Sequence, residues 1–165
     1  MDASTFYALF SATCFTLTGL WWNVVRARTD WMADTAIRRT IGGVYLSFLL
    51  PALMGLFAQV GGTESPLIWR LSFVVISVVG AVSMLRLVSQ ARGDRTARAL
   101  RWTQLGTVVV YAAIAVIGVA PQLAAPLGLS GIQVGALLLI VLVALGHALV
   151  WRFMVTDEAG RGGDE

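Results

Sequence analysis

The stretch LSGIQVGALLLIVLVALGHALVWRF, residues 129–153, decides the class of this protein. It contains no acidic residue, and its one basic residue, Arg152, stands at the far end. An α-helix rises about 1.5 Å per residue, so about 20 apolar residues cross the hydrocarbon core of a bilayer, which is about 30 Å thick. The sequence therefore predicts a transmembrane helix here. Four further stretches of the same kind predict four more, at residues 6–25, 41–60, 67–88 and 104–124.

The composition of the whole chain agrees with an integral membrane protein. The chain is 58% hydrophobic and 13% charged, whereas soluble domains average about 45–50% apolar and about 25% charged residues. The apolar stretches lack the alternation of barrel strands, and every backbone group must be satisfied inside lipid, so helices are expected. We predict an all-α, polytopic protein with one transmembrane domain over residues 1–155. A disordered, acidic cytoplasmic tail is expected over residues 156–165.

The arginines predict the orientation of the chain. Eleven of the twelve basic residues, all arginine, flank the apolar stretches on one side, and Arg70 is the exception. The positive-inside rule then places the amino end outside and the carboxyl end in the cytoplasm, in a plasma membrane. The basic segments are expected to meet anionic lipid headgroups there. Tryptophans near the predicted span ends agree with an interfacial belt, namely Trp21, Trp22, Trp69, Trp102 and Trp151.

Two parts of the chain resemble each other. Residues 27–30 read ARTD and residues 91–94 read ARGD, and several small and polar positions after them also align with a one-residue gap. A two-helix unit would then be duplicated in parallel, with a fifth helix added, as in transporters whose sites form between repeats. Chance is the alternative, because a chain rich in Ala, Gly and Arg produces such matches.

Two predicted spans carry small and polar residues on one helix face. In residues 41–60 the spacing is four throughout, which keeps these residues on one slowly turning face. Small residues let helices approach, and hydroxyls and amides bond across helices, so both faces are predicted to be helix contacts. The alternative is that the two faces line a cavity. The faces comprise Gly43, Ser47, Pro51, Gly55 and Gln59 in one span, and Thr107, Tyr111, Ala115, Gly118 and Gln122 in the other.

Three further features are candidates for contact or function. The pattern GxxxG at residues 131–135 indicates a close helix contact, within the chain or between copies. His147, the only histidine, is expected inside the membrane near the cytoplasmic interface. It is expected to bond to a neighbouring helix or to interfacial water, and a proton relay is the alternative. Glu64 and Arg70 are expected to pair at the outer face, either structurally or at a pore entrance.

The sequence contains no recognised catalytic pattern. P-loop, GxSxG, HExxH and CxxC motifs are absent. No metal or cofactor site is expected, because the chain has one histidine and one cysteine, placed towards different leaflets, and no acidic residue in mid-membrane. Nucleic-acid binding is not expected either, because the basic loops are short and lack an aromatic stacking platform.

We therefore expect a non-enzymatic membrane component that associates with itself or with a partner membrane protein. The main alternative is a small channel or transporter for an ion, a proton or a small solute. A membrane enzyme or cofactor carrier is the least favoured reading. The path of a channel would be lined by Ser47, Gln59, Tyr111, Gln122 and His147.

Overall fold

The computed structural model describes residues 2–61, 65–90 and 95–161. All regular structure in these ranges is helical, as the composition predicts. The five long helices and the two short 3-10 helices follow one another as α1 (Ala3–Ala27), η1 (Thr29–Met32), α2 (Thr35–Gly61), α3 (Pro66–Gln90), α4 (Arg95–Val119), η2 (Pro121–Leu127) and α5 (Gly131–Arg161).

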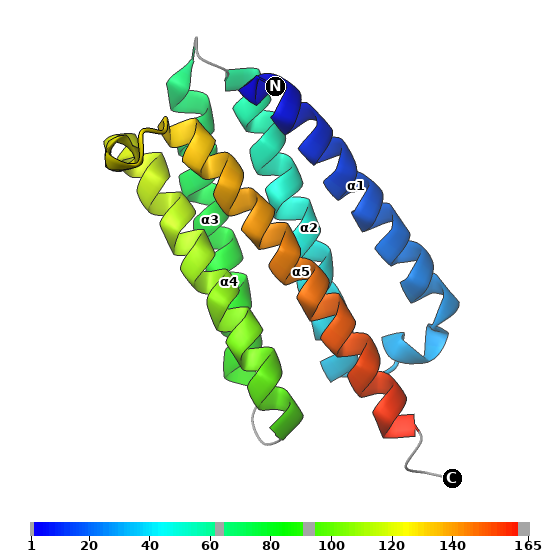
Figure 1. Ribbon diagram of the computed structural model, residues 1–165. Coiled ribbons are helices and arrows are strands. Elements are labelled where there is room, and N and C mark those ends of the chain that lie inside the picture. Colours follow the sequence, from blue (N-terminus) through cyan, green and yellow to red (C-terminus); the bar gives the residue numbers. More distant parts are fainter. Residues whose placement is uncertain (1, 62–64, 91–94, 162–165) are drawn as a thin grey trace.

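Each long helix contains a segment that is long and apolar enough to cross a membrane. The chain therefore has the build of a multi-pass membrane protein, and the predicted five-helix, all-α class is confirmed at this level. Successive long helices run in opposite directions (Figure 1). The apolar segments are Ala3–Ala27, Ile37–Gly61, Pro66–Ser89, Arg101–Val119 and Gly131–Val155.

Helix α2 is the centre of the bundle. It contacts α1, α3 and α5, whereas α4 contacts α3 and α5. Within the described residues, the backbones of α2 and α4 do not come close to each other, although Leu50 and Met54 of α2 belong to the same core cluster as Tyr111 and Ile114 of α4. In the most apolar part of α2, 61% of the residues are buried inside the bundle, compared with 22% in the most apolar part of α3. Accordingly, α1 lies on one side of α2, and α3 and α4 lie on the other (Figure 1).

The two ends of the bundle differ in charge. We call the end that carries the α1–α2 connection and the last turns of α5 the arginine-rich end; it is at the bottom of Figure 1. Every arginine whose side chain is described lies towards this end, except Arg70 near the start of α3. The opposite end carries the start of α1 and η2.

An aromatic cluster closes the arginine-rich end. The rings of Trp21 and Trp31 each lie against Phe153, with centroid distances of 6.1 and 5.0 Å. The indole N–H of Trp21 donates to the carbonyl oxygen of Ile41 at 3.3 Å. Trp21, Trp31 and Trp69 are buried, so these residues hold helices together. The other three tryptophans are exposed near the ends of the apolar segments, as an interfacial belt requires: Trp22, Trp102 and Trp151.

Most of the long helices extend beyond the predicted spans, and two of the boundaries change the interpretation. The fourth span was expected to reach residue 124, but α4 ends at Val119. Pro121 has no N–H to continue the helix, and the chain turns through η2 to Gly128, whose φ of 68° is left-handed. Helix α5 continues to Arg161, so residues 156–161 of the expected disordered tail are helical. No proline follows the span, so the helix elongates beyond it, since each added residue gains one backbone bond.

The second copy of the proposed repeat begins with residues 91–94, which lie outside the described residues. The parallel duplication therefore stays a prediction.

Candidate functional site

The small and polar face of α2 is packed inside the bundle. A spacing of four residues turns the face by about 40° per step, so its members meet different neighbours. A Cβ atom at Gly43 would lie 2.5 Å from Cδ1 of Leu87 in α3. A Cβ atom at Gly55 would collide with the hydroxyl of Ser11 in α1. This face is therefore shared between helices on two sides of α2.

Ser47 and Pro51 of the same face are also buried. The Ser47 hydroxyl donates to the carbonyl oxygen of Val44 at 2.7 Å, and a Cβ atom at Gly146 in α5 would lie 3.0 Å from this hydroxyl. Helix α2 continues through Pro51. Gln59, in contrast, is exposed near the end of the helix.

The corresponding face of α4 is turned towards α3. Tyr111 is buried, and its ring fills the space that a side chain at Gly80 would need. Gly118 lies against the start of α3, where its Cβ atom would be 3.0 Å from the Arg70 carbonyl oxygen. The Thr107 hydroxyl donates to the Thr103 carbonyl oxygen at 2.9 Å. Close packing of α3 on α4 uses this face.

The structure does not bring the five expected path residues together. Ser47 lies against α5 and Tyr111 against α3, while Gln59 is exposed on α2. Gln122 is exposed and belongs to η2. Since α4 ends at Val119, Gln122 does not continue the α4 face.

His147 is exposed on α5. Its Nδ1 atom lies 2.9 Å from the Val143 carbonyl oxygen, one turn earlier in the same helix. The ring meets Phe48 of α2 edge-on, with a centroid distance of 5.3 Å. The His147 ring therefore forms its hydrogen bond within α5 and not with a neighbouring helix.

Arg70 caps the end of α4. Its Nε atom donates to the Gly118 carbonyl oxygen at 2.9 Å, and its Nη2 atom donates to the Val119 carbonyl oxygen at 2.7 Å. The last carbonyls of a helix have no partner in the helix, and a cation there also opposes the helix dipole. Arg70 therefore has a structural role. Its predicted partner, Glu64, lies outside the described residues, so that pair stays a prediction.

The GxxxG pattern of α5 makes contacts within the chain. Cβ atoms at Gly131 and Gly135 would lie 2.6 Å from the side chains of Pro121 and Phe73, respectively. Between these glycines, the Tyr7 hydroxyl of α1 donates to the Ile132 carbonyl oxygen at 2.7 Å. The pattern thus joins α5 to α1, α3 and η2.

A second small-residue face, which was not predicted from the sequence, points outwards from α1. Ala12, Thr16, Gly19 and Asn23 are all exposed, and their spacing of four, three and four places them on one side of the helix. A Cβ atom at Gly19 would meet nothing within 4 Å. The Thr16 hydroxyl is satisfied by the Ala12 carbonyl oxygen at 2.9 Å. The spacing alone could have identified this face, but not its direction.

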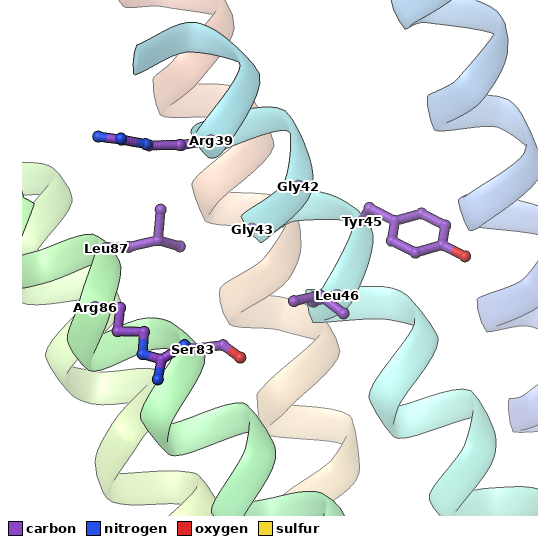
Figure 2. A pocket seen from close by; sticks show the side chains of 8 residues that line it. All are labelled: Arg39, Gly42, Gly43, Tyr45, Leu46, Ser83, Arg86 and Leu87. Atoms are coloured by element: carbon purple, nitrogen blue, oxygen red, sulfur yellow. The ribbon is translucent and has the colours of Figure 1, made fainter. Parts of the chain in front are cut away.

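Two open grooves lie on the surface. The first, of about 450 Å³, runs between α2 and α3 near the arginine-rich end (Figure 2). The second, of about 290 Å³, lies between the starts of α1 and α5, where Phe6 and Leu137 are among its lining residues.

Three buried polar atoms have no hydrogen-bond partner among the described residues. They are the hydroxyl oxygens of Ser77 and Tyr111 and the amide oxygen of Gln104. All three belong to α3 or α4.

The described residues contain no cluster of three histidine, cysteine or acidic side chains that could hold a metal ion. Searches for similarity against protein-family models, curated proteins and solved structures found no match to this chain. Its role must therefore be argued from its own surfaces.

Proposed function

We propose that this chain is a non-enzymatic component of the plasma membrane that associates with a second copy of itself or with another membrane protein. The arginine-rich end lies in the cytoplasm in this proposal, because basic segments next to membrane helices are retained there. The same arginines then face anionic headgroups.

The observation that supports association is the outward face of α1, formed by Ala12, Thr16, Gly19 and Asn23. Lipid contact gives no advantage to small residues, whereas close contact with another helix favours them, because small residues let two backbones approach. The amide of Asn23 adds donors and an acceptor on this exposed side, and such groups bond across helices in lipid. The glycines of α5 that fit GxxxG are already used inside the chain.

The test is energy transfer between two differently labelled pools of the protein in liposomes. We expect transfer for the wild type and its loss in Gly19→Leu, because a leucine on this face would hold the partner helix away. The control is Ala112→Leu, which places the same side chain on an exposed position of α4. Absence of transfer in the wild type, or equal transfer in both variants, would contradict self-association through α1.

A second candidate function is a small channel or transporter. It is favoured by the unpartnered buried oxygens of Ser77, Gln104 and Tyr111 in α3 and α4, because buried polar groups without partners are rare and costly in a purely structural bundle. Flux of protons, ions or small solutes into liposomes tests it. Flux no faster than in empty vesicles would refute the idea, and Tyr111→Phe should lower any flux that depends on this hydroxyl.

A further inference from the structure

The groove between α2 and α3 combines positive charge, open space and apolar walls. It is lined by residues of both helices, and Figure 2 shows Leu46 of α2 and the Ser83 hydroxyl of α3 directed towards each other's helix, with Tyr45 pointing away from α3. Its volume of about 450 Å³ lies in the range of ligand sites, roughly 300–1,000 Å³. The lining residues are Arg39, Gly42, Gly43, Tyr45, Leu46, Ser83, Arg86 and Leu87.

Two adjacent glycines shape this groove in different ways. Gly43 lies against Leu87, where a Cβ atom would be 2.5 Å from the leucine Cδ1 atom, so the two helices are in close contact there. A Cβ atom at Gly42 would meet nothing within 4 Å. The missing side chain at Gly42 therefore leaves room in the groove without serving a contact inside the chain.

Arg39 and Arg86 give the groove its charge. Both side chains are exposed, and neither has a hydrogen-bond or ion-pair partner among the described residues. The Ser83 hydroxyl already donates to the Val79 carbonyl oxygen at 2.7 Å, so the guanidinium groups supply the free donors. Figure 2 shows the two guanidinium groups at different points along the groove, not directed at one another.

The depth of the groove in the membrane indicates which kind of anion it binds. Arg39 lies two residues inside the apolar segment of α2, and Arg86 lies three residues inside that of α3. At 1.5 Å per residue both are about 3–5 Å from the segment ends, which is the level of lipid headgroups. Leu46 continues the groove from Arg39 towards the middle of the membrane.

We propose that this groove binds one anionic phospholipid. The guanidinium groups of Arg39 and Arg86 attract its anionic headgroup from two points of the groove, and either can bind the phosphate oxygens with paired donors. The glycerol backbone occupies the space above Gly42, and an acyl chain follows Leu46. Basic pockets between membrane helices are known to hold such headgroups. This site depends on the helices lying in a bilayer and is independent of association through α1.

The test is native mass spectrometry of the detergent-solubilised full chain with added lipid. We expect one phosphatidylglycerol to bind in preference to phosphatidylcholine, whose choline adds a cation beside the two arginines. Arg39→Gln with Arg86→Gln should weaken phosphatidylglycerol binding by about tenfold or more, because both positive charges of the groove and the charge-assisted contact to the phosphate are lost. Gly42→Leu should also weaken it, by filling the groove while both charges remain. Arg101→Gln, at the same end but outside the groove, should change it by less than about twofold.

Each of the following outcomes would overturn the proposal. Equal binding of the two lipids would show that the groove does not recognise anionic lipid. An equal loss in Arg101→Gln would show general charge attraction instead of a site. Displacement of the lipid by inorganic phosphate would assign the groove to a free anion. Unchanged binding in Gly42→Leu would place the lipid elsewhere. The three arginines are exposed and Gly42 is half-buried with open space beside it, so elution and circular dichroism that match the wild type would exclude misfolding as the cause of any loss.

Discussion

Replacing Gly118 by alanine tests how tightly α3 and α4 are packed. The new Cβ atom would lie 2.9 Å from Cγ2 of Val74, 3.0 Å from the Arg70 carbonyl oxygen and 3.5 Å from Cβ of Phe73. The Arg70 carbonyl oxygen is a backbone atom, which cannot move without moving α3, whereas the distance to Phe73 is an ordinary van der Waals contact. The end of α4 must therefore shift away from α3, and the shift also lengthens the hydrogen bonds that Arg70 makes to α4.

The size of the effect follows from two opposing terms. Overpacking of this kind costs about 1–3 kcal/mol. Alanine has a higher helix propensity than glycine, which returns up to about 1 kcal/mol. We expect Gly118→Ala to lower the free energy of unfolding by about 1–2 kcal/mol. Gly19→Ala, where the added methyl group meets nothing within 4 Å, should leave stability unchanged or raise it by up to about 1 kcal/mol.

The assay is unfolding by sodium dodecyl sulfate in mixed micelles, followed through the fluorescence of the buried tryptophans. Trp69 is one residue from Arg70 and reports on the region that moves. The midpoint should fall for Gly118→Ala and stay or rise for Gly19→Ala. Equal midpoints for Gly118→Ala and the wild type would refute the close contact of α3 and α4, and with it the role of Gly118 in packing.

Three further predictions follow from named contacts. Arg70→Met should lower the free energy of unfolding by about 2–4 kcal/mol in the same assay, because two charge-assisted hydrogen bonds to α4 are lost, whereas Arg70→Lys should lose less. Tyr111→Phe should leave stability unchanged or raise it by about 1 kcal/mol, because it removes an oxygen without a partner; a large loss would reveal a partner for that hydroxyl. The backbone N–H of Thr5 holds the pKa of Asp2 below its usual 3.8, so this cap acts above pH 3.8 and is lost as the pH falls through the lower folded value. Amide exchange at Thr5 should therefore rise in acid, and it should stay constant with pH in Asp2→Asn after correction for intrinsic exchange.

The sequence predicts where the helices lie along the chain better than it predicts which helices pack against each other. The length of an apolar stretch is a local property, so all five long helices could be located. The end of α4 was misplaced because the stretch stays apolar through η2, and Pro121 acts through the backbone rather than through hydropathy.

The partners of the small-residue faces could not be predicted from the sequence. Spacing identifies which residues share a face, but Gly43 meets α3 and Gly55 meets α1, because the face turns along α2. The contact of Arg70 with a helix end that lies 48 residues away could not be found from the sequence either, and its pair with Glu64 stays a prediction. Such contacts depend on how the helices assemble, which no local pattern contains.

The glycines of the long helices are of two kinds: some lie in contacts inside the bundle, and others face open space on its surface. At positions such as Gly80, Gly118 and Gly135 a Cβ atom would strike a neighbouring helix, so glycine is required for packing within the chain. Gly19 and Gly42 have open space instead. Glycine in a helix interior costs up to about 1 kcal/mol relative to alanine, and no contact within the chain offsets this cost at these two positions. A contact from outside the chain does so in both proposals, with a helix against Gly19 and a phospholipid against Gly42. If alanine at both positions stabilises the isolated chain yet leaves association and lipid binding unchanged, then neither glycine serves an external contact, and both proposals lose this argument.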